Sequence, residues 1–165
     1  MTRHKTASPH VGFDSRCPGW TRIALAGVLL FLLLPGRSLA SEYSGVADWT
    51  RANDGDTFWL CATGVCTKIR LCGIDAPEAD DPGGRDAGAA LKSIVADHPV
   101  RCVQVGDGTL CDGRSKPTNG DRVVAQCFAA GRDIALEMVQ QGQACDWIAF
   151  SNGAYAAVVP SACRK

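Results

Sequence analysis

Residues 53–78 read NDGDTFWLCATGVCTKIRLCGIDAPE. Two runs in this segment, 57–62 and 67–74, are rich in Thr, Phe, Trp, Ile and Leu, a composition that favours β-strands. Groups of Asn, Asp, Gly and Pro stand at both ends and predict turns. The segment therefore predicts a β-hairpin. Charged residues lie at the ends of its two strands, namely Asp54, Asp56, Arg70, Asp75 and Glu78.

Further strands and helices are predicted on both sides of this hairpin. A mild alternation of apolar and polar residues indicates a strand at 43–49, and two more strands are predicted at 100–105 and 123–129. Helical spacing of apolar residues predicts a helix at 85–96, and the cap residues Asp133 and Gly142 bound a second one at 134–141. One short helix is expected within 154–159. Five strands and a few helices in about 125 residues predict an α+β fold, a five-stranded Greek-key β-barrel of the OB-fold type with capping helices.

The first 40 residues have the pattern of an export signal. Four basic residues precede the apolar run IALAGVLLFLLL at 23–34, and Ser38-Leu39-Ala40 follows as a small-residue cleavage site. A membrane-spanning helix needs about 20 apolar residues, so a cleaved signal is favoured over a permanent anchor. We expect a signal peptide at 1–40, cleaved after Ala40, and a folded domain at 41–165, located in the periplasm or secreted.

Eight cysteines remain after residue 40, and an even number in an exported domain predicts a disulfide framework. One pairing follows from position, because Cys61 and Cys66 would face each other across a hairpin; the others stay open. The same 125 residues hold 12 basic and 16 acidic residues, a formal net charge of −4. A protein that only binds phosphates usually carries a basic field, so tight non-catalytic nucleic-acid binding is disfavoured.

Composition argues against histidine chemistry, and a Ser-His-Asp arrangement, although formally possible, lacks its G-x-S-x-G motif. His98 is the one histidine after residue 40, and a histidine-ligated zinc site or a paired-histidine mechanism needs more than one. Carboxylate oxygens from Asp56 and Asp75 with a nearby backbone carbonyl would instead suit Ca²⁺ or Mg²⁺. Arg70 and Arg122 could bind a phosphodiester, and Glu78 could orient or deprotonate a water molecule.

Each of these residues also has a plain structural interpretation. The acidic residues beside Gly55 are common turn formers. Arg70 could pair with a neighbouring carboxylate, and Arg122 could be a solvated strand end. The tryptophans Trp49, Trp59 and Trp147 are interpreted as packing residues rather than as platforms for bases.

Four sequence motifs, taken together, favour the catalytic interpretation of these residues over the structural one. They are DGDTFWL at 54–60, IRLCGIDAPE at 69–78, DRVVAQC at 121–127 and DIALEMVQQGQA at 133–144. Their order and spacing resemble the staphylococcal nuclease (thermonuclease) family, and in particular its cysteine-rich exported bacterial branch. The resemblance implies an OB-fold barrel and a phosphodiesterase that depends on one Ca²⁺ ion, with Mg²⁺ the less expected ion, and that cuts DNA and RNA.

The resemblance also implies roles for individual residues. Asp56, Asp75 and the backbone carbonyl of Ala76 match the calcium ligands, and Asp54 matches an acidic position behind them. The matches to the catalytic positions are Arg70, Glu78 and Arg122. Around Asn119-Gly120-Asp121 and from Trp147 to Phe150 the sequence departs from the family, since a lysine and tyrosines of the nucleotide pocket are replaced.

We therefore expect a monomeric, exported nuclease that acts on DNA or RNA without a protein partner or a lasting membrane anchor. Two alternatives remain: a catalytically inactive OB-fold module that binds nucleic acid, and a disulfide-stabilised protein-interaction domain.

Overall fold

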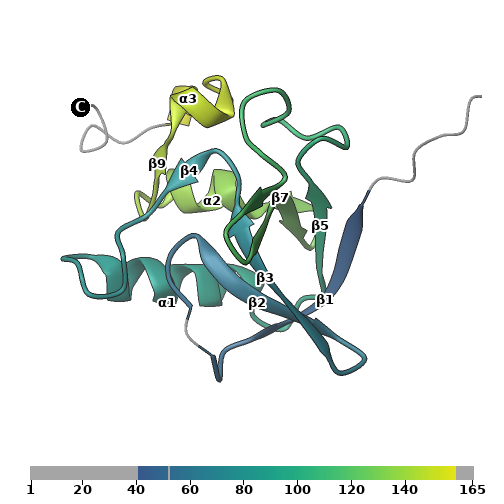
Figure 1. Ribbon diagram of the computed structural model, residues 1–165. Helices are drawn as coiled ribbons and strands as arrows, with labels where there is room; N and C mark the ends of the chain where they lie inside the picture. Colours follow the sequence, from purple (N-terminus) through teal and green to yellow (C-terminus); the bar gives the residue numbers. More distant parts are fainter. Residues whose placement is uncertain (1–40, 52, 159–165) are drawn as a thin grey trace, which may run out of the picture. The chain divides into compact units, whose positions relative to one another are not determined.

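The computed structural model describes residues 41–51 and 53–158, whose backbone forms a closed ring of five strands (Figure 1). The ring consists of β1 (Glu42–Asp48), β2 (Thr57–Ala62), β3 (Val65–Leu71), β5 (Val100–Gln104) and β7 (Arg122–Ala129). Antiparallel pairs join β3 to β2, β2 to β1, β1 to β5 and β5 to β7, and a parallel pair between β3 and β7 closes the ring. The predicted five-stranded barrel with helices is confirmed. The export signal expected at 1–40 lies outside the described residues.

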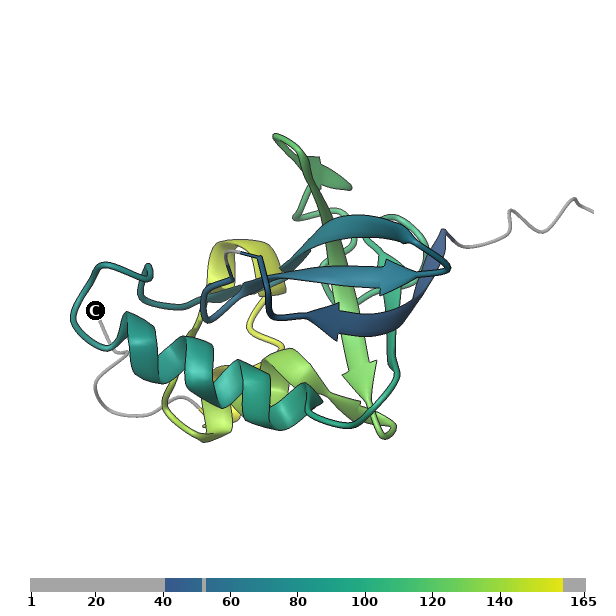
Figure 2. The ribbon, with the colours of Figure 1, turned by 90° about the horizontal axis from the view of Figure 1, so that it is seen from below.

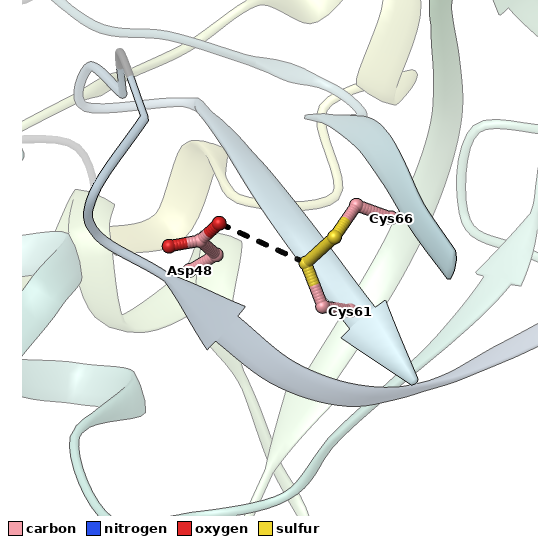
Figure 3. A group of neighbouring side chains, drawn as sticks. All are labelled: Asp48, Cys61 and Cys66. Atoms are coloured by element: carbon pink, nitrogen blue, oxygen red, sulfur yellow. Dashed lines mark hydrogen bonds between the residues drawn. A yellow bond between two sulfur atoms is a disulfide. The ribbon is translucent and has the colours of Figure 1, made fainter. Parts of the chain in front are cut away.

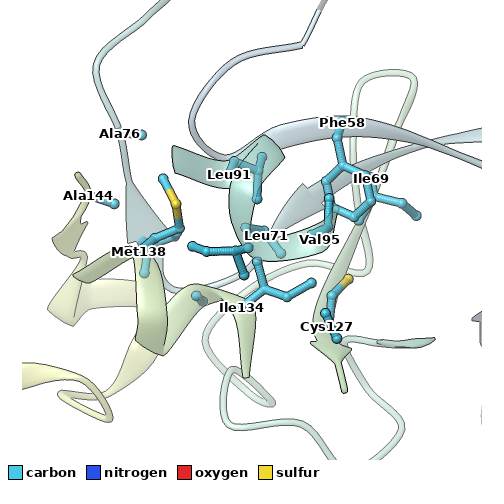
Figure 4. Close-up of a cluster of buried hydrophobic side chains, with 14 of the residues drawn as sticks. Phe58, Ile69, Leu71, Ala76, Leu91, Val95, Cys127, Ile134, Met138 and Ala144 are labelled. Carbon is cyan, nitrogen blue, oxygen red and sulfur yellow. The ribbon is translucent and has the colours of Figure 1, made fainter. Parts of the chain in front are cut away.

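Two helices cover one side of the strands. Helix α1 (Gly84–Val95) and helix α2 (Ile134–Gln140) lie beneath the β2–β3 hairpin in Figure 2. Their apolar faces meet the inward side chains of the barrel. The close-up in Figure 4 shows this shared core, which includes Phe58, Ile69 and Leu71 from the strands, Leu91 and Val95 from α1, and Ile134 and Met138 from α2.

The predicted strand at 67–74 begins two residues earlier and ends three residues earlier than expected. Strand β3 ends at Leu71, and Ile74–Asp75 forms a separate strand, β4, which pairs with β9 (Cys145–Asp146). The cause is Gly73, whose φ of 76° turns the chain and whose place leaves no room for a side chain, because a Cβ there would lie 2.9 Å from that of Ser151. The turn ends the barrel strand and lets Ile74 and Asp75 pair with Asp146 and Cys145 instead.

The C-terminal part agrees with the prediction at α2 and differs beyond it. Asp133 caps α2 as expected, accepting hydrogen bonds from the backbone N–H groups of Ala135 and Leu136 at 2.9 and 3.2 Å. The helix expected within 154–159 is a 3-10 helix over Ala156–Val158, and an additional helix, α3 (Ile148–Ser151), precedes it. The same Asp133 carboxylate binds the hydroxyl of the buried Tyr155, which fastens this segment to α2.

Three disulfides join six of the described cysteines in pairs. Cys61 and Cys66 are bonded across a two-residue turn, as predicted (Figure 3). Cys102 and Cys127 face each other on β5 and β7. Cys72 bonds Cys111, which ties the long loop at 106–117 to the end of β3. Cys145 is also disulfide-bonded.

The Cys72–Cys111 disulfide is expected to contribute more stability than the hairpin disulfide. It spans 39 residues against 5 for Cys61–Cys66, and a longer crosslinked loop removes more entropy from the unfolded chain. Replacing both Cys72 and Cys111 by Ser should lower the free energy of unfolding by about 4 kcal/mol, against about 2 kcal/mol for the same change at Cys61 and Cys66. Urea denaturation of the two double variants measures the difference. Equal losses would contradict it.

None of the helices in the described part of the chain has the length and the apolar character needed to cross a membrane.

Candidate active site

The turn before β2 is built by Asp54. Its carboxylate accepts hydrogen bonds from the backbone N–H groups of Asp56 and Thr57 at 3.0 and 2.6 Å. Gly55 presses this turn against helix α1, since a Cβ there would lie 2.6 Å from Ala87 and 2.7 Å from Ala76. Asp54 is thus a turn former, and the turn that it orders presents Asp56 to the interior.

Arg70 lies between two carboxylates. Its Nη1 is 2.6 Å from Asp56 Oδ2, and its Nη2 is 3.7 Å from Asp75 Oδ1. The Asp56 side chain is 8% exposed, whereas that of Asp75 is 63% exposed. The backbone N–H of Ala76 also donates to Asp56 Oδ2, at 3.0 Å. The structure therefore brings Asp56, Asp75 and the Ala76 backbone around one guanidinium group.

Burial makes Asp56 an unusual carboxyl group. Removal from water raises its pKa above the ordinary range, and the Arg70 guanidinium and the Ala76 N–H offset part of this increase. A carboxylate so poorly solvated gains more from a bound cation than one in open water does.

Arg122 comes from a distant part of the sequence and lies near Asp56 as well. It begins β7, directly after the two-residue turn Gly120-Asp121 that joins β7 to β6 (Thr118–Asn119). Its Nη1 donates to the hydroxyl of Thr57 at 3.3 Å, and that hydroxyl donates to Asp56 Oδ1 at 3.0 Å. Thr57 also pairs with Arg70 in the hairpin. Both arginines thus approach Asp56, one directly and one through Thr57.

Glu78 is the predicted site residue that the structure leaves apart from this network. Its side chain is exposed on the segment between β4 and α1, and it forms no hydrogen bond or ion pair with any described residue. Its backbone carbonyl is fixed, because Gly84 lies so close that an added Cβ would meet the Glu78 oxygen at 1.8 Å. The carboxylate is therefore free while its backbone is held.

A pocket of about 410 Å³ opens beside Arg70. Arg114 and Lys116 line it from the loop, and both side chains are exposed and form no ion pair among the described residues. Trp147 and Phe150 line it from the C-terminal segment, with ring centroids 4.5 Å apart in an edge-to-face arrangement. Cations and aromatic rings thus meet next to the arginine, a combination suited to a phosphate and a base.

Several residues of this site were not predicted from the sequence. Thr57 could have been found from the hairpin register, which places it opposite Arg70. Arg114 and Lys116 stand out as cations on a long loop, but no local signal places them in the pocket, because the Cys72–Cys111 disulfide anchors that loop. The role of Trp147 in the pocket depends on β9, whose residues carry no strand signal.

The donor set suits a hard divalent cation. Asp56 and Asp75 offer carboxylate oxygens and Ala76 a backbone carbonyl, which are the ligand types that Ca²⁺ prefers. Arg70 spans these two carboxylates in the structure. Among the described residues, one group of three ligating side chains lies within 4.8 Å, namely Asp48, Cys61 and Cys66 (Figure 3). The two sulfur atoms of that group are bonded to each other, so it is not a metal site.

Comparison with known proteins shows which family has these residues in its matching region. A family model described as "Staphylococcal nuclease homologue" matches residues 68–158, more than half of the chain. The chain belongs to the staphylococcal nuclease family. In this family member the matched region contains Arg70, Asp75, Glu78 and Arg122, whereas Asp56 and Thr57 precede it and join the site through the barrel.

A curated relative supports the same assignment. A protein from Haemophilus influenzae named "Uncharacterized endonuclease" is 27% identical over 124 residues. The similarity covers 74% of this staphylococcal nuclease homologue but 64% of the relative, so the chain spans less than two thirds of that protein.

Proposed function

We propose that this protein is an exported, Ca²⁺-dependent nuclease that hydrolyses phosphodiester bonds of DNA and RNA. The observation that carries the proposal is the convergence of Arg70 and Arg122 on Thr57 and Asp56 at the edge of the aromatic and cationic pocket. Two forked guanidinium groups in one place match the charge of a phosphodiester, which increases as the pentacoordinate state forms. A nucleic-acid substrate also agrees with the family.

The proposed reaction is an attack of water on phosphorus. Glu78, whose carboxylate is free, takes a proton from the water as the new O–P bond forms. Arg70 and Arg122 stabilise the negative charge on the phosphoryl oxygens. The P–O bond to the leaving sugar then breaks, and solvent protonates the departing oxygen.

Asp56, Asp75 and the Ala76 carbonyl are the residues that would hold one Ca²⁺ ion, with Asp54 fixing the turn behind them. When bound, the ion would offset phosphate charge and polarise the bond that is attacked. The burial of Asp56 and the exposure of Asp75 are consistent with a site that is anchored on one side and open to substrate on the other.

Location and processing belong to the same proposal. Disulfides persist in oxidising compartments, and the pairs in this domain agree with a periplasmic or secreted protein. We assign 1–40 to a cleaved signal peptide and 41–165 to the nuclease domain, which acts as a monomer.

The decisive experiment is cleavage of single-stranded DNA and RNA by the oxidised domain with Ca²⁺, followed by a chelator. Activity should disappear with the chelator and return with added Ca²⁺. Glu78→Gln should lower kcat by about 100-fold or more, because the general base is lost. Cleavage that persists in chelator would refute the dependence on Ca²⁺. Binding without any cleavage would instead support the non-catalytic alternative.

Gly84→Ala should reduce activity by about tenfold although it lies outside the site. The new Cβ cannot share space with the Glu78 carbonyl, so the segment that carries Glu78 must shift, and small displacements of a catalytic group are costly. Gly88→Ala is the matched control in the same helix, since its Cβ would meet nothing closer than 4.0 Å. Steady-state cleavage kinetics of both variants measure the difference in activity. Equal activity in the two would contradict the proposed placement of Glu78.

A further inference from the structure

The β2–β3 hairpin has an outer face of which the proposed reaction uses only the end with Thr57 and Arg70. Phe58, Leu60 and Ile69 point into the core, so the residues that alternate with them point outward. Cross-strand pairs on this outer face follow one another in the order Thr57 with Arg70, Trp59 with Lys68, and Cys61 with Cys66. The face therefore leads from the catalytic arginine to the hairpin disulfide.

Trp59 occupies the middle of this face and lies outside the hydrophobic core. The Arg51 guanidinium carbon is 4.6 Å from the centroid of its ring, and Lys68 Nζ is 5.9 Å from it. We call Arg51, Trp59 and Lys68 the outer strip. It combines an indole with two cations, the elements with which proteins bind single-stranded nucleic acid without reading its sequence.

The two cations of the outer strip are only weakly engaged. Arg51 pairs with Asp48 at 3.0 Å and Lys68 with Asp121 at 3.4 Å, and the Arg51 and Asp121 side chains are 46% and 72% exposed. Exposed ion pairs contribute little free energy. A phosphate group can therefore replace either carboxylate at small cost.

The spacing relates the outer strip to the catalytic residues. Trp59 and Lys68 lie two residues along their strands from Thr57 and Arg70, a step of about 7 Å. A nucleotide chain whose scissile phosphate is held at Arg70 would have its neighbouring nucleotide over this pair. The outer face of these two strands is also where OB-folds commonly bind oligonucleotides.

We infer that the outer strip is a second substrate subsite, which binds an unpaired nucleotide next to the scissile phosphate by stacking its base on Trp59 and pairing its phosphate with Lys68. The inference rests on the proposed function and deepens it, because it adds a second binding position for the substrate strand beside the scissile phosphate. A paired base cannot stack on Trp59, so duplex substrates gain nothing from the strip.

The test compares methyl p-nitrophenyl phosphate, a phosphodiester without a nucleotide, with a single-stranded oligonucleotide of about 12 nucleotides. In Trp59→Ala, the ratio of kcat/KM for the oligonucleotide to that for the small diester should fall about tenfold, and Trp59→Phe should restore most of it. Lys68→Glu should lower the same ratio and reduce the salt dependence of binding. Lys92→Glu, the same charge change on the exposed face of α1, should leave the ratio unchanged.

A binding measurement separates this inference from the proposed function. Fluorescence anisotropy with the labelled oligonucleotide is recorded in chelator, where no cleavage is expected. About tenfold weaker binding by Trp59→Ala supports the strip even if no substrate is ever cleaved, an outcome that would count against the proposed function alone. Unchanged binding and an unchanged kcat/KM ratio in both Trp59→Ala and Lys68→Glu, with folding verified by thermal melting, would overturn the strip.

Discussion

Arg70→Lys is expected to lower kcat by about 100-fold to 1,000-fold while the protein stays folded. Lysine keeps the positive charge, so the buried Asp56 carboxylate retains a counterion. It lacks the planar fork with which Arg70 reaches Asp56 at 2.6 Å and Asp75 at 3.7 Å, and with which it would bind two phosphoryl oxygens. Steady-state cleavage kinetics measure the loss.

Lysine is the informative substitution because alanine would mix two effects. Removing one partner of a buried ion pair typically costs about 3–5 kcal/mol, so Arg70→Ala could lose activity by unfolding. Arg132→Lys is a suitable control, since Arg132, which is not among the site residues, has an exposed side chain that pairs with Glu137 at 3.0 Å. If Arg70→Lys cleaves DNA as fast as the unaltered protein, a two-point contact with phosphate is not part of the mechanism.

Asp75→Asn is expected to weaken Ca²⁺ binding by about 100-fold or more. Changes to residues that merely support metal ligands already cost about 10-fold to 100-fold, and Asp75 is proposed as a direct ligand. Its side chain is 63% exposed, so the change should leave the fold intact, unlike a change at the buried Asp56. Calorimetric titration with Ca²⁺ measures the affinity, and the Ca²⁺ concentration at half-maximal activity should rise in parallel.

Asp80→Asn provides the comparison for Asp75. Asp80 is an exposed carboxylate on the segment that follows β4, and removing its charge tests whether general electrostatics explain the effect. Ca²⁺ affinity should hardly change in this variant. Similar losses in Asp75→Asn and Asp80→Asn would mean that Asp75 is not a specific ligand.

Much of the barrel could be predicted because local patterns and the overall topology agree. Alternation within 57–62 and 67–71 places Arg70 on the outer face, and the turn at Thr63-Gly64 fixes the register that sets Cys61 opposite Cys66. The cap at Asp133 follows from its side chain alone. Each of these features depends on residues close together in the sequence.

The remaining parts of the site depend on contacts between distant residues. The sequence left the partner of Cys111 open, and its bond to Cys72 decides where the loop with Arg114 and Lys116 lies. Nothing near Arg122 indicates that its guanidinium donates to Thr57. The four aligned sequence blocks predicted that such residues belong together, but only the closed barrel provides the distances.

The parallel pairing of β3 with β7 has a consequence for how the molecule acquires activity. This seam joins Ile69, Arg70 and Leu71 to Val123, Val124 and Ala125. It is a contact of high sequence separation, and such contacts form late because a long stretch of chain must first be ordered. A chain in which the seam is open has one guanidinium group at Asp56 instead of two. On the proposed mechanism, activity therefore requires the paired strands β3 and β7, because this pairing brings Arg122 to the side of the barrel that carries Arg70.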